Sequence, residues 1–348
     1  MSWAERALGE LLERAGAVEA RLEGRWPLYA DPATGHWTTT ARGSWTGGFW
    51  AGLLWLRAIM GGGPADRAAA AGRTAALAPW LQADTATRGL ILWYGTAFGV
   101  MAGDASAVAL RDHAARTCLD AYDSELGLVP WGGAFGGSRE LARVDGLPGL
   151  LRLLRLAGPG GEAAAQSQLD RQLGLTAGER ELPPAWRALP GGAWEPYPDP
   201  PPGWSRTVGW LSLAVADTGD GDRRRALLAH PRVAARFAAG SPAAPLVRPG
   251  GPPDTSAAAI EALAALKLAA WTGRESGAAG RGGAAPLRDR AAGVLRELVA
   301  EHLRGGRLLD GCYDADHGVA TRHELVWGDF FLAVGLAVLT SAIDPFAC

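Results

Sequence analysis

The chain has 348 residues, of which 34 are basic, 36 are acidic and 48% are hydrophobic, and its formal net charge is -2. Like charges form no long block, which argues against a nucleic-acid-binding protein, because such proteins usually carry a basic patch. A charged, amphipathic N-terminus and the absence of an apolar run of about 20 residues argue against a signal peptide and a membrane span. We therefore expect a cytoplasmic protein.

Two kinds of helix alternate in the predicted elements. Amphipathic segments, which suit an outer layer, alternate with segments that are apolar on all sides and must therefore be buried on all sides. Six helices of each kind predict an all-α (α/α)6 barrel that occupies residues 1–348 as a single domain. In chain order, outer then inner, the pairs are 3–23 and 44–56, 64–82 and 88–100, 104–121 and 144–154, 161–175 and 204–216, 221–239 and 254–266, and 286–304 and 327–339.

Four long connections precede inner helices, at residues 24–43, 122–143, 176–203 and 305–326. They all reach the N-terminal ends of inner helices, so we expect them to crowd one mouth of the barrel, where binding sites are usually built. The helix N-termini that meet there favour an anionic ligand. Two stretches of small residues, 240–253 and 273–285, are predicted to be mobile connections, and the arginines at 223–225 are predicted to lie on a solvated helix face.

Asp145 stands at the start of the third inner helix. An aspartate at this position is commonly an N-cap, which is one interpretation. The other is a general acid/base whose protonated form is favoured by a partly apolar pocket. Trp131, in the preceding loop, would wall that pocket. Asp254 and Asp329, at the starts of the fifth and sixth inner helices, are predicted to be caps.

Two arginines lie at the starts of inner helices, Arg88 in the second and Arg206 in the fourth. A cation in the first turn of a helix is repelled by the positive end of the helix dipole, so it needs a specific anionic partner. Arg206 either binds a substrate carboxylate or pairs with an aspartate at the same mouth. Arg88 is a further candidate for substrate binding.

Tryptophan is abundant, with 15 copies, and many of them flank glycines or helix starts. They either fill the barrel core or form flat walls for a small ring. Three histidines, His36, His317 and His323, fall in the mouth loops, whereas His113, His230 and His302 fall on outer helices. The candidate substrate-binding residues are Trp45, Trp131, Arg206, Trp204, His36, His323, Trp327 and Arg88.

No metal-binding spacing such as CxxC or HExxH is present, so we expect neither a metal nor a cofactor. The three widely spaced cysteines, Cys118, Cys312 and Cys348, indicate a reduced chain without disulfides. The expected partner is a small molecule or an oligosaccharide, with no nucleic acid and no membrane.

Five motifs occur in order along the chain: Gly43-Ser-Trp-Thr-Gly-Gly-Phe-Trp, Val144-Asp-Gly-Leu, Trp204-Ser-Arg-Thr-Val-Gly-Trp, Asp254-Thr-Ser-Ala-Ala-Ala-Ile and Trp327-Gly-Asp-Phe-Phe-Leu. Together they resemble the unsaturated glucuronyl hydrolases of glycoside hydrolase family 88 and their relatives in family 105. This resemblance implies an (α/α)6 barrel in which an aspartate, matched by Asp145, protonates the double bond of an unsaturated uronic acid while water adds beside it. It also implies sugar-binding roles for Trp45, Trp131 and Arg206.

The chain departs from that family at the second inner helix, where Thr87-Arg-Gly89 replaces a His-Asp pair and the nearby Asp84 is out of register. A histidine of the family is also missing between residues 160 and 203. Three hypotheses follow. The first is a glycoside-hydrolase-like enzyme that uses Asp145 on an unsaturated uronic acid or a related small molecule. The second is a diverged cyclase, isomerase or dehydratase of specialised metabolism on the same barrel, and the third is a non-catalytic binding protein. The last predicts a cavity filled by the chain's own side chains.

Overall fold

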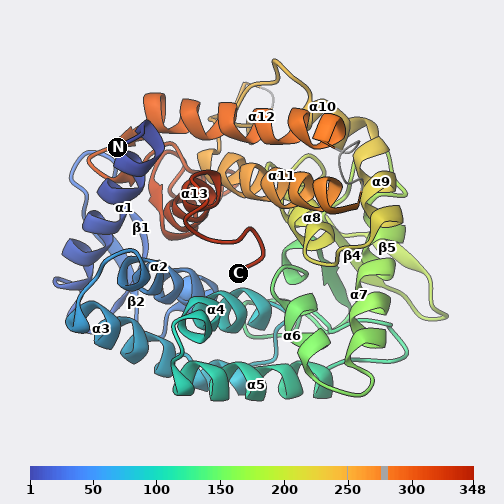
Figure 1. Cartoon of the computed structure of the whole chain (residues 1–348). Helices are drawn as coiled ribbons and strands as arrows, with labels where there is room; N and C mark the ends of the chain where they lie inside the picture. Colours follow the sequence, from blue (N-terminus) through green and yellow to red (C-terminus); the bar gives the residue numbers. More distant parts are fainter. Residues whose placement is uncertain (249, 276–280) are drawn as a thin grey trace.

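Inner and outer helices form two concentric rings in the computed structural model, which describes residues 1–248, 250–275 and 281–348 (Figure 1). The predicted (α/α)6 barrel is confirmed for this part of the chain. The inner ring contains α2 (Gly47–Ile59), α4 (Tyr94–Met101), α6 (Leu150–Leu156), α8 (Thr207–Ala216), α11 (Thr255–Glu275) and α13 (Val326–Leu339). The outer ring contains α1 (Trp3–Glu19), α3 (Pro64–Ala75), α5 (Ala105–Asp120), α7 (Gly161–Thr176), α9 (Gly221–Ala229), α10 (Pro231–Phe237) and α12 (Arg281–Glu297).

The inner helices are buried on every side, as their composition requires. In α13 every residue from Val326 to Val338 is buried, and the helix packs against α1, α2 and α11. The outer helix α1 instead buries one stripe, which includes Leu8, Leu11 and Val18. This difference in periodicity is what assigns each helix to its ring.

The ring closes where the first and last elements meet. Helix α1 packs against both α2 and α13 (Figure 1). Arg14 of α1 and Arg307 both bind the fully buried carboxylate of Glu324, at N···O distances of 3.2 and 2.7 Å. The two ends of the chain are therefore joined by packing and by a charged cluster.

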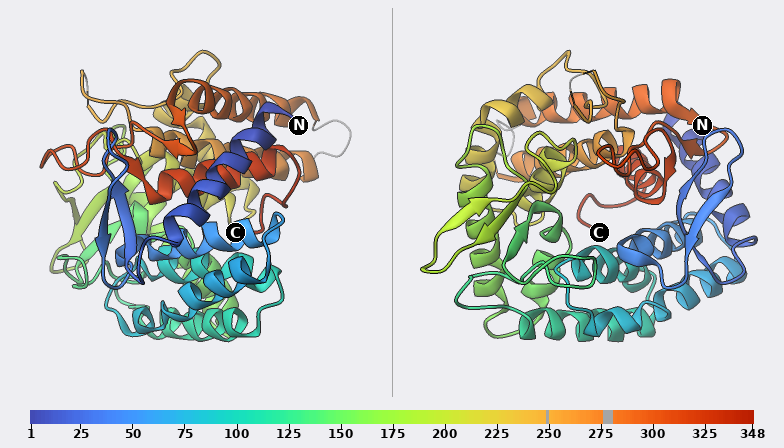
Figure 2. Two further views of the ribbon diagram at one scale, coloured as in Figure 1. Left: turned by 90° about the vertical axis from the view of Figure 1, so that its left-hand side faces the viewer. Right: turned by 180° about the vertical axis from the view of Figure 1, so that it is seen from behind.

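Three small sheets, which the sequence did not predict, order the long mouth loops. The first has the strand order β2 (Trp37–Thr40), β1 (Trp26–Ala30) and β8 (Glu324–Leu325). The second has the order β3 (Leu141–Arg143), β4 (Ala185–Ala188) and β5 (Trp194–Pro196), and the third pairs β6 (Leu303–Arg304) with β7 (Arg307–Leu308). The first two sheets lie at the same end of the barrel (Figure 2). Strand β3 leads directly into Asp145.

Several predicted helix boundaries were wrong for local reasons. The third inner helix starts as a 3-10 turn at Val144–Gly146 and becomes α-helical only at Leu150, because Gly149 adopts a φ of 73°. The predicted outer helix 221–239 divides into α9 and α10 at Pro231, which begins α10. The described parts of the predicted connection 273–285 are helical, since α11 ends at Glu275 and α12 begins at Arg281. Pro249 and residues 276–280 lie outside the described residues.

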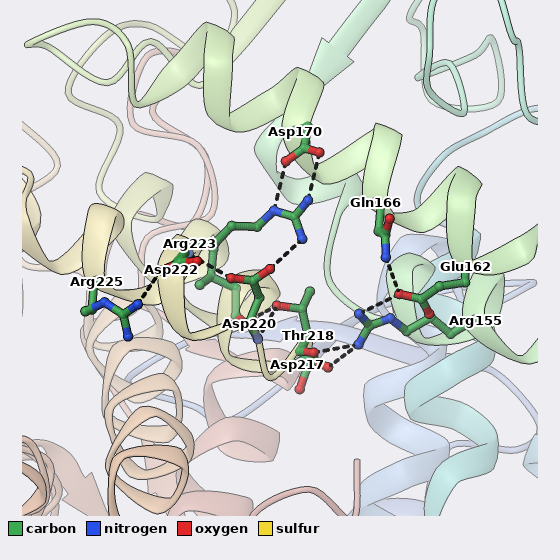
Figure 3. Close-up of polar contacts among 11 residues, drawn as sticks. Arg155, Glu162, Gln166, Asp170, Asp217, Thr218, Asp220, Asp222, Arg223 and Arg225 are labelled. Atoms are coloured by element: carbon green, nitrogen blue, oxygen red, sulfur yellow. Dashed lines mark hydrogen bonds and ion pairs between the residues drawn. The ribbon is translucent and has the colours of Figure 1, made fainter. Parts of the chain in front are cut away.

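The arginine run at 223–225 is not the solvated face that we expected. Arg223 binds Asp170 of α7 at 2.7 Å and Asp220 at 3.0 Å (Figure 3). Arg224 is buried. Only Arg225 is exposed, and it pairs with Asp222. The run therefore joins α9 to α7.

Arg155 at the end of α6 extends this network (Figure 3). It binds Glu162 of α7 at 3.0 Å and donates to the carbonyl of Thr218, just after α8, at 2.9 Å. Arg155 thus ties the C-terminal end of α6 both to the outer helix α7 and to the end of α8. No helix within the described residues has the length and apolarity to cross a membrane.

Candidate active site

A cavity of about 390 Å³ opens at the N-terminal ends of the inner helices. The predicted convergence is present for three of the four long loops, since Trp131, Asp199 and Tyr313 each come from a different one of them and line the same cavity. Loop 24–43 supplies no lining residue itself but leads directly to Ser44 and Trp45, which do line it. Residues from two further segments, around Thr87 and Val247, complete the lining. Asp145 and Trp204 therefore share one mouth of the barrel.

Indole rings form much of the wall. Trp45 is half-buried and lies 4.7 Å, centroid to centroid, from the fully buried Trp327. Ser44, just before Trp45, adopts a φ of 53°, an uncommon conformation for a residue other than glycine. Such local strain persists only where the surrounding structure imposes it, and here it fixes the position of Trp45.

Asp145 lines the cavity in a bidentate ion pair with Arg143. Both carboxylate oxygens accept hydrogen bonds from the guanidinium at 3.0 Å, and the Asp145 side chain is 13% exposed. The Arg143 guanidinium in turn lies 4.1 Å above the ring of Trp131. The carboxylate caps no helix, because α6 begins five residues later. The cap interpretation of Asp145 is therefore wrong, and the carboxylate is paired with a cation instead of standing alone in an apolar pocket.

Arg206 lines the same cavity but is already paired inside the protein. It donates to Asp254 at 2.9 Å and to the carbonyl oxygens of Cys312 and Tyr313. Asp254 is fully buried and also accepts from Ser205, Ser256 and the backbone N–H of Ala257, so the predicted cap of α11 is present. Of the two alternatives for Arg206, the structure displays the pairing with an aspartate.

Four candidate substrate-binding residues do not line the cavity. The Arg88 guanidinium is buried and donates to the carbonyls of Leu81, Thr85 and Thr117. His36 is exposed between β1 and β2, whereas Trp327 lies behind Trp45. His323 packs edge-on against Tyr29, and its burial lowers its pKa. Asp84, which the sequence placed near the missing carboxylate but out of register, binds Arg139 on the surface and does not line the cavity.

Asp329 also departs from its predicted role as a cap. Its carboxylate is buried in the first turn of α13, where it accepts the backbone N–H of Leu308 in β7 at 3.0 Å. Desolvation and the neighbouring Glu324 raise the pKa of Asp329 well above its usual value, although Arg14 and Arg307 act in the opposite direction. Asp329 therefore joins α13 to β7 instead of capping its own helix.

The sequence analysis missed a group of carboxylates around His317. The Nδ1 atom of His317 lies 2.8 Å from Asp314, and both line the cavity together with Asp199 and Asp316. The hydrogen bond and charge of Asp314 raise the pKa of His317, and Asp199 and Asp316 add to this effect. Partial burial acts to raise the pKa of Asp314, but hydrogen bonds from His317 outweigh it and the pKa is lowered. The long loop 305–326 had pointed to His317, but nothing in the sequence linked it to Asp199.

The other reactive groups of the site offer little nucleophilic chemistry. Burial raises the pKa of the Cys312 thiol to about 11, so the thiol stays protonated at neutral pH. Over residues 1–248, 250–275 and 281–348, no three side chains of His, Cys, Asp or Glu gather in a way that could hold a metal ion. The three cysteines are buried and free.

No family model and no curated protein matches the sequence. Solved structures do share the fold. An unsaturated glucuronyl hydrolase from Bacillus sp. GL1 superposes with a TM-score of 0.83 at 19% identity over 98% of each chain. An unsaturated glucuronyl hydrolase from Streptococcus agalactiae superposes with a TM-score of 0.80 at 16% identity over 99% of this chain and 94% of that chain. A variant designated UGL, with dGlcA-Glc-Rha-Glc, superposes with a TM-score of 0.85 at 19% identity over 98% of both chains. The resemblance seen in the motifs is thus confirmed for the fold.

Proposed function

We propose that this chain is an enzyme of the glycoside hydrolase type that acts on a small saccharide or a related unsaturated ring, with Asp145 moving the proton. One observation carries the proposal: the Asp145 carboxylate lies in a cavity of about 390 Å³ whose walls include Trp45, Trp131 and Trp204. Flat aromatic walls suit a small ring, and a carboxylate beside them suits general acid/base catalysis. The fold shared with the unsaturated glucuronyl hydrolases is consistent with this role.

The pairing with Arg143 sets the order of events at Asp145. Both oxygens of the carboxylate accept hydrogen bonds from the guanidinium, so a substrate has to displace Arg143 to reach them. To act as an acid on an alkene, Asp145 has to donate a proton, so its oxygens have to be released from Arg143 in the complex with substrate. The stacking of Arg143 on Trp131 leaves the guanidinium at the edge of the sugar-sized space.

Hydration of an unsaturated uronic acid is the reaction that the resemblance implies, and the cavity wall argues against it as the main activity. Thr87 and Leu90 form the wall at the second inner helix, and the Thr87 hydroxyl is bonded to that of Thr85 at 2.8 Å. Neither side chain supplies the charge that would orient the reacting water, and one lost electrostatic group can cost several kcal/mol of barrier. We expect weak activity on unsaturated glucuronyl disaccharides, measured as loss of the ultraviolet absorbance of their double bond. Rapid loss of this absorbance would instead show that the chain catalyses the reaction of the unsaturated glucuronyl hydrolases.

A changed reaction on the same barrel is the second candidate, and the same wall favours it. A cyclase, isomerase or dehydratase needs the proton transfer of Asp145 but no positioned water. The hypothesis of a non-catalytic binding protein predicted a cavity filled by its own side chains, and the cavity is open.

The substitution Asp145→Asn tests the proposal. Asp145 caps no helix, so the variant should stay folded, but loss of the ion pair with Arg143 should lower its melting temperature modestly. Turnover of any substrate found by screening saccharides with mass-spectrometric detection should fall by roughly two to four orders of magnitude, the usual contribution of general acid/base catalysis.

The matched control is Asp84→Asn, which makes the same change in a half-exposed carboxylate bound to Arg139. It should leave turnover unchanged. Full activity of Asp145→Asn would remove Asp145 from the mechanism, and early melting would assign it a structural role.

A further inference from the structure

The guanidinium of Arg143 uses only one of its two carboxylate-binding edges inside the protein. Its Nε and Nη2 atoms donate to the two oxygens of Asp145, both at 3.0 Å. The other edge, formed by Nη1 and the second N–H of Nη2, has no acceptor among the described residues. A guanidinium carries five N–H groups in a planar fork whose edges match a carboxylate. The pair with Asp145 therefore leaves Arg143 one complete binding edge.

This free edge belongs to a side chain that is largely buried and yet faces the cavity. Arg143 is part of the lining of the cavity of about 390 Å³, and its side chain is 16% exposed. The Nη1 atom is accessible, because the buried polar atoms that lack a partner in the described part of the chain do not include it. A ligand in the cavity can therefore reach the free edge.

The surrounding elements fix the position of the guanidinium. Its Cζ atom lies 4.1 Å from the ring centroid of Trp131. The backbone N–H of Trp131 donates to Leu141 at 2.9 Å, and its carbonyl accepts from Ala86 at 3.1 Å. Arg143 itself lies in β3, opposite Ala185 of β4. A guanidinium that stacks on an aromatic face keeps its in-plane N–H groups for acceptors, so the free edge is organised before a ligand arrives.

The other two arginines of the lining do not combine burial with an unused edge. Arg206 directs both of its Nη groups to acceptors within the protein. Arg248 is exposed, so water and salt screen its charge. The rim carboxylates of Asp199 and Asp316 repel an anion, but they are exposed and screened in the same way. Burial strengthens the attraction of Arg143 relative to all of these charges.

We propose that Arg143 determines the specificity of the site by binding a carboxylate of the ligand on its free edge. This inference rests on the proposed function for the saccharide ring and adds the residue that selects the ring's substituent. The ligand carboxylate on Nη1 and Nη2 is separated by a single guanidinium from Asp145, the group that moves the proton. Its attraction to the guanidinium exceeds its repulsion from Asp145, because the guanidinium is nearer and Coulomb energies fall with distance.

The same arrangement favours an acidic ligand when Asp145 is released. Proton transfer requires the Asp145 oxygens to leave Arg143. A neutral ligand that separated the pair would leave a largely buried guanidinium without a counter-charge, which is strongly unfavourable. A ligand carboxylate replaces the anion that Arg143 loses, so the guanidinium keeps charge-assisted hydrogen bonds throughout. Specificity for a carboxylate thus follows from the ion pair itself.

The test compares the methyl glycosides of glucuronic acid, glucuronamide and glucose. The amide has nearly the shape of the acid but no charge. Binding is measured by titration calorimetry and by quenching of tryptophan fluorescence. The glucuronide should bind about tenfold more tightly than the glucuronamide, a difference that one charge-assisted hydrogen bond supplies. The glucoside should bind no better than the glucuronamide.

Variants assign this preference to the ion pair. Arg143→Gln should abolish it. Asp145→Asn leaves Arg143 unchanged and removes the competing carboxylate, so glucuronide affinity should rise by roughly tenfold while glucoside affinity stays the same. The double change Arg143→Gln and Asp145→Asn removes both charges, leaves none unpaired and should again show no preference. A purely structural role for Arg143 predicts no gain in Asp145→Asn.

The matched control is Arg139→Gln, on the loop that precedes β3. Arg139 pairs with Asp84 at 2.7 Å, is half-exposed and lies outside the cavity lining. Its replacement should leave the affinities for all three glycosides unchanged.

Each remaining result overturns a separate idea. Equal affinities for the glucuronide and the glucuronamide overturn the inference and leave the proposed function intact. A preference that survives in Arg143→Gln and disappears in Arg248→Gln also overturns it, because the carboxylate then binds at the rim. An unchanged glucuronide affinity in Asp145→Asn overturns the sharing of one guanidinium by two carboxylates. Failure of all three glycosides to bind overturns the proposed saccharide site together with the inference.

Discussion

At the scale of single residues, buried charges decide which side chains remain available for chemistry. Asp254 accepts from Ser205, Arg206, Ser256 and two backbone N–H groups, so it is fully used in structure. Asp145 has one partner, Arg143, and keeps a face on the cavity. Two aspartates that look alike as helix starters in the sequence therefore have different roles, because only one is surrounded by donors on all sides.

Asp329 provides a residue-scale prediction about pH. Its raised pKa means that the folded protein holds a proton that the unfolded chain releases above about pH 4. Stability therefore falls as the pH rises from there toward the folded pKa. Asp329→Asn keeps an acceptor for Leu308 and carries no such penalty. Its free energy of unfolding, relative to the wild type, should grow from pH 4 to pH 7, by at most about 1.4 kcal/mol per pH unit.

Denaturant unfolding across this pH range measures the effect. The control is Asp112→Asn on the outer helix α5, where the half-exposed carboxylate pairs with Arg111 and its loss should change stability by no more than about 1 kcal/mol. A stability difference for Asp329→Asn that is constant with pH would show that Asp329 is ionised in the folded protein.

At the scale of elements, glycines set how closely the inner helices approach one another. A Cβ on Gly48 of α2 would lie 2.3 Å from the carbonyl oxygens of both Leu90 and Ile91, in the π-helical turn Gly89–Trp93 that precedes α4. Backbone atoms cannot move aside as a flexible side chain can. The glycines of the apolar segments therefore serve packing at the mouth, directly beside the cavity wall formed by Thr87 and Leu90.

Gly48→Ala should lower the free energy of unfolding by about 3 kcal/mol, the upper end of the usual cost of overpacking. The control is Gly9→Ala in α1, where no atom lies within 4 Å of the added Cβ. That change should raise stability by up to about 1 kcal/mol, because alanine is the better helix former. Urea unfolding of both variants makes the comparison, and equal stabilities would contradict the close approach of α2 to the turn.

At the scale of the whole molecule, closure of the ring makes the stability of each helix depend on its neighbours. Helix α1 packs against α2 and α13 (Figures 1 and 2). The Glu324 carboxylate bridges Arg14 to Arg307. On the outer side, Arg223 ties α9 to α7, and Arg155 ties the end of α6 to α7 (Figure 3). We propose that residues 1–348 behave as one folding domain.

That proposal predicts a single cooperative transition. Unfolding in urea followed by far-ultraviolet circular dichroism, which reports helix, should coincide with unfolding followed by fluorescence of the 15 tryptophans. Coincident curves from independent probes are the standard criterion for two-state behaviour. Two separated midpoints would divide the chain into independent folding units.

The sequence by itself determined the barrel, because burial on all sides and burial on one side leave different periodicities that can be read residue by residue. It also placed Asp145, Trp45, Trp131 and Trp204 at one mouth, since helix starts and long loops are local features. Charge pairing was decided only by the tertiary structure. The partners Arg206 and Asp254 are 48 residues apart in the sequence. No local pattern encodes such contacts, so the pairing of Arg206 with Asp254 is established only when the ring closes.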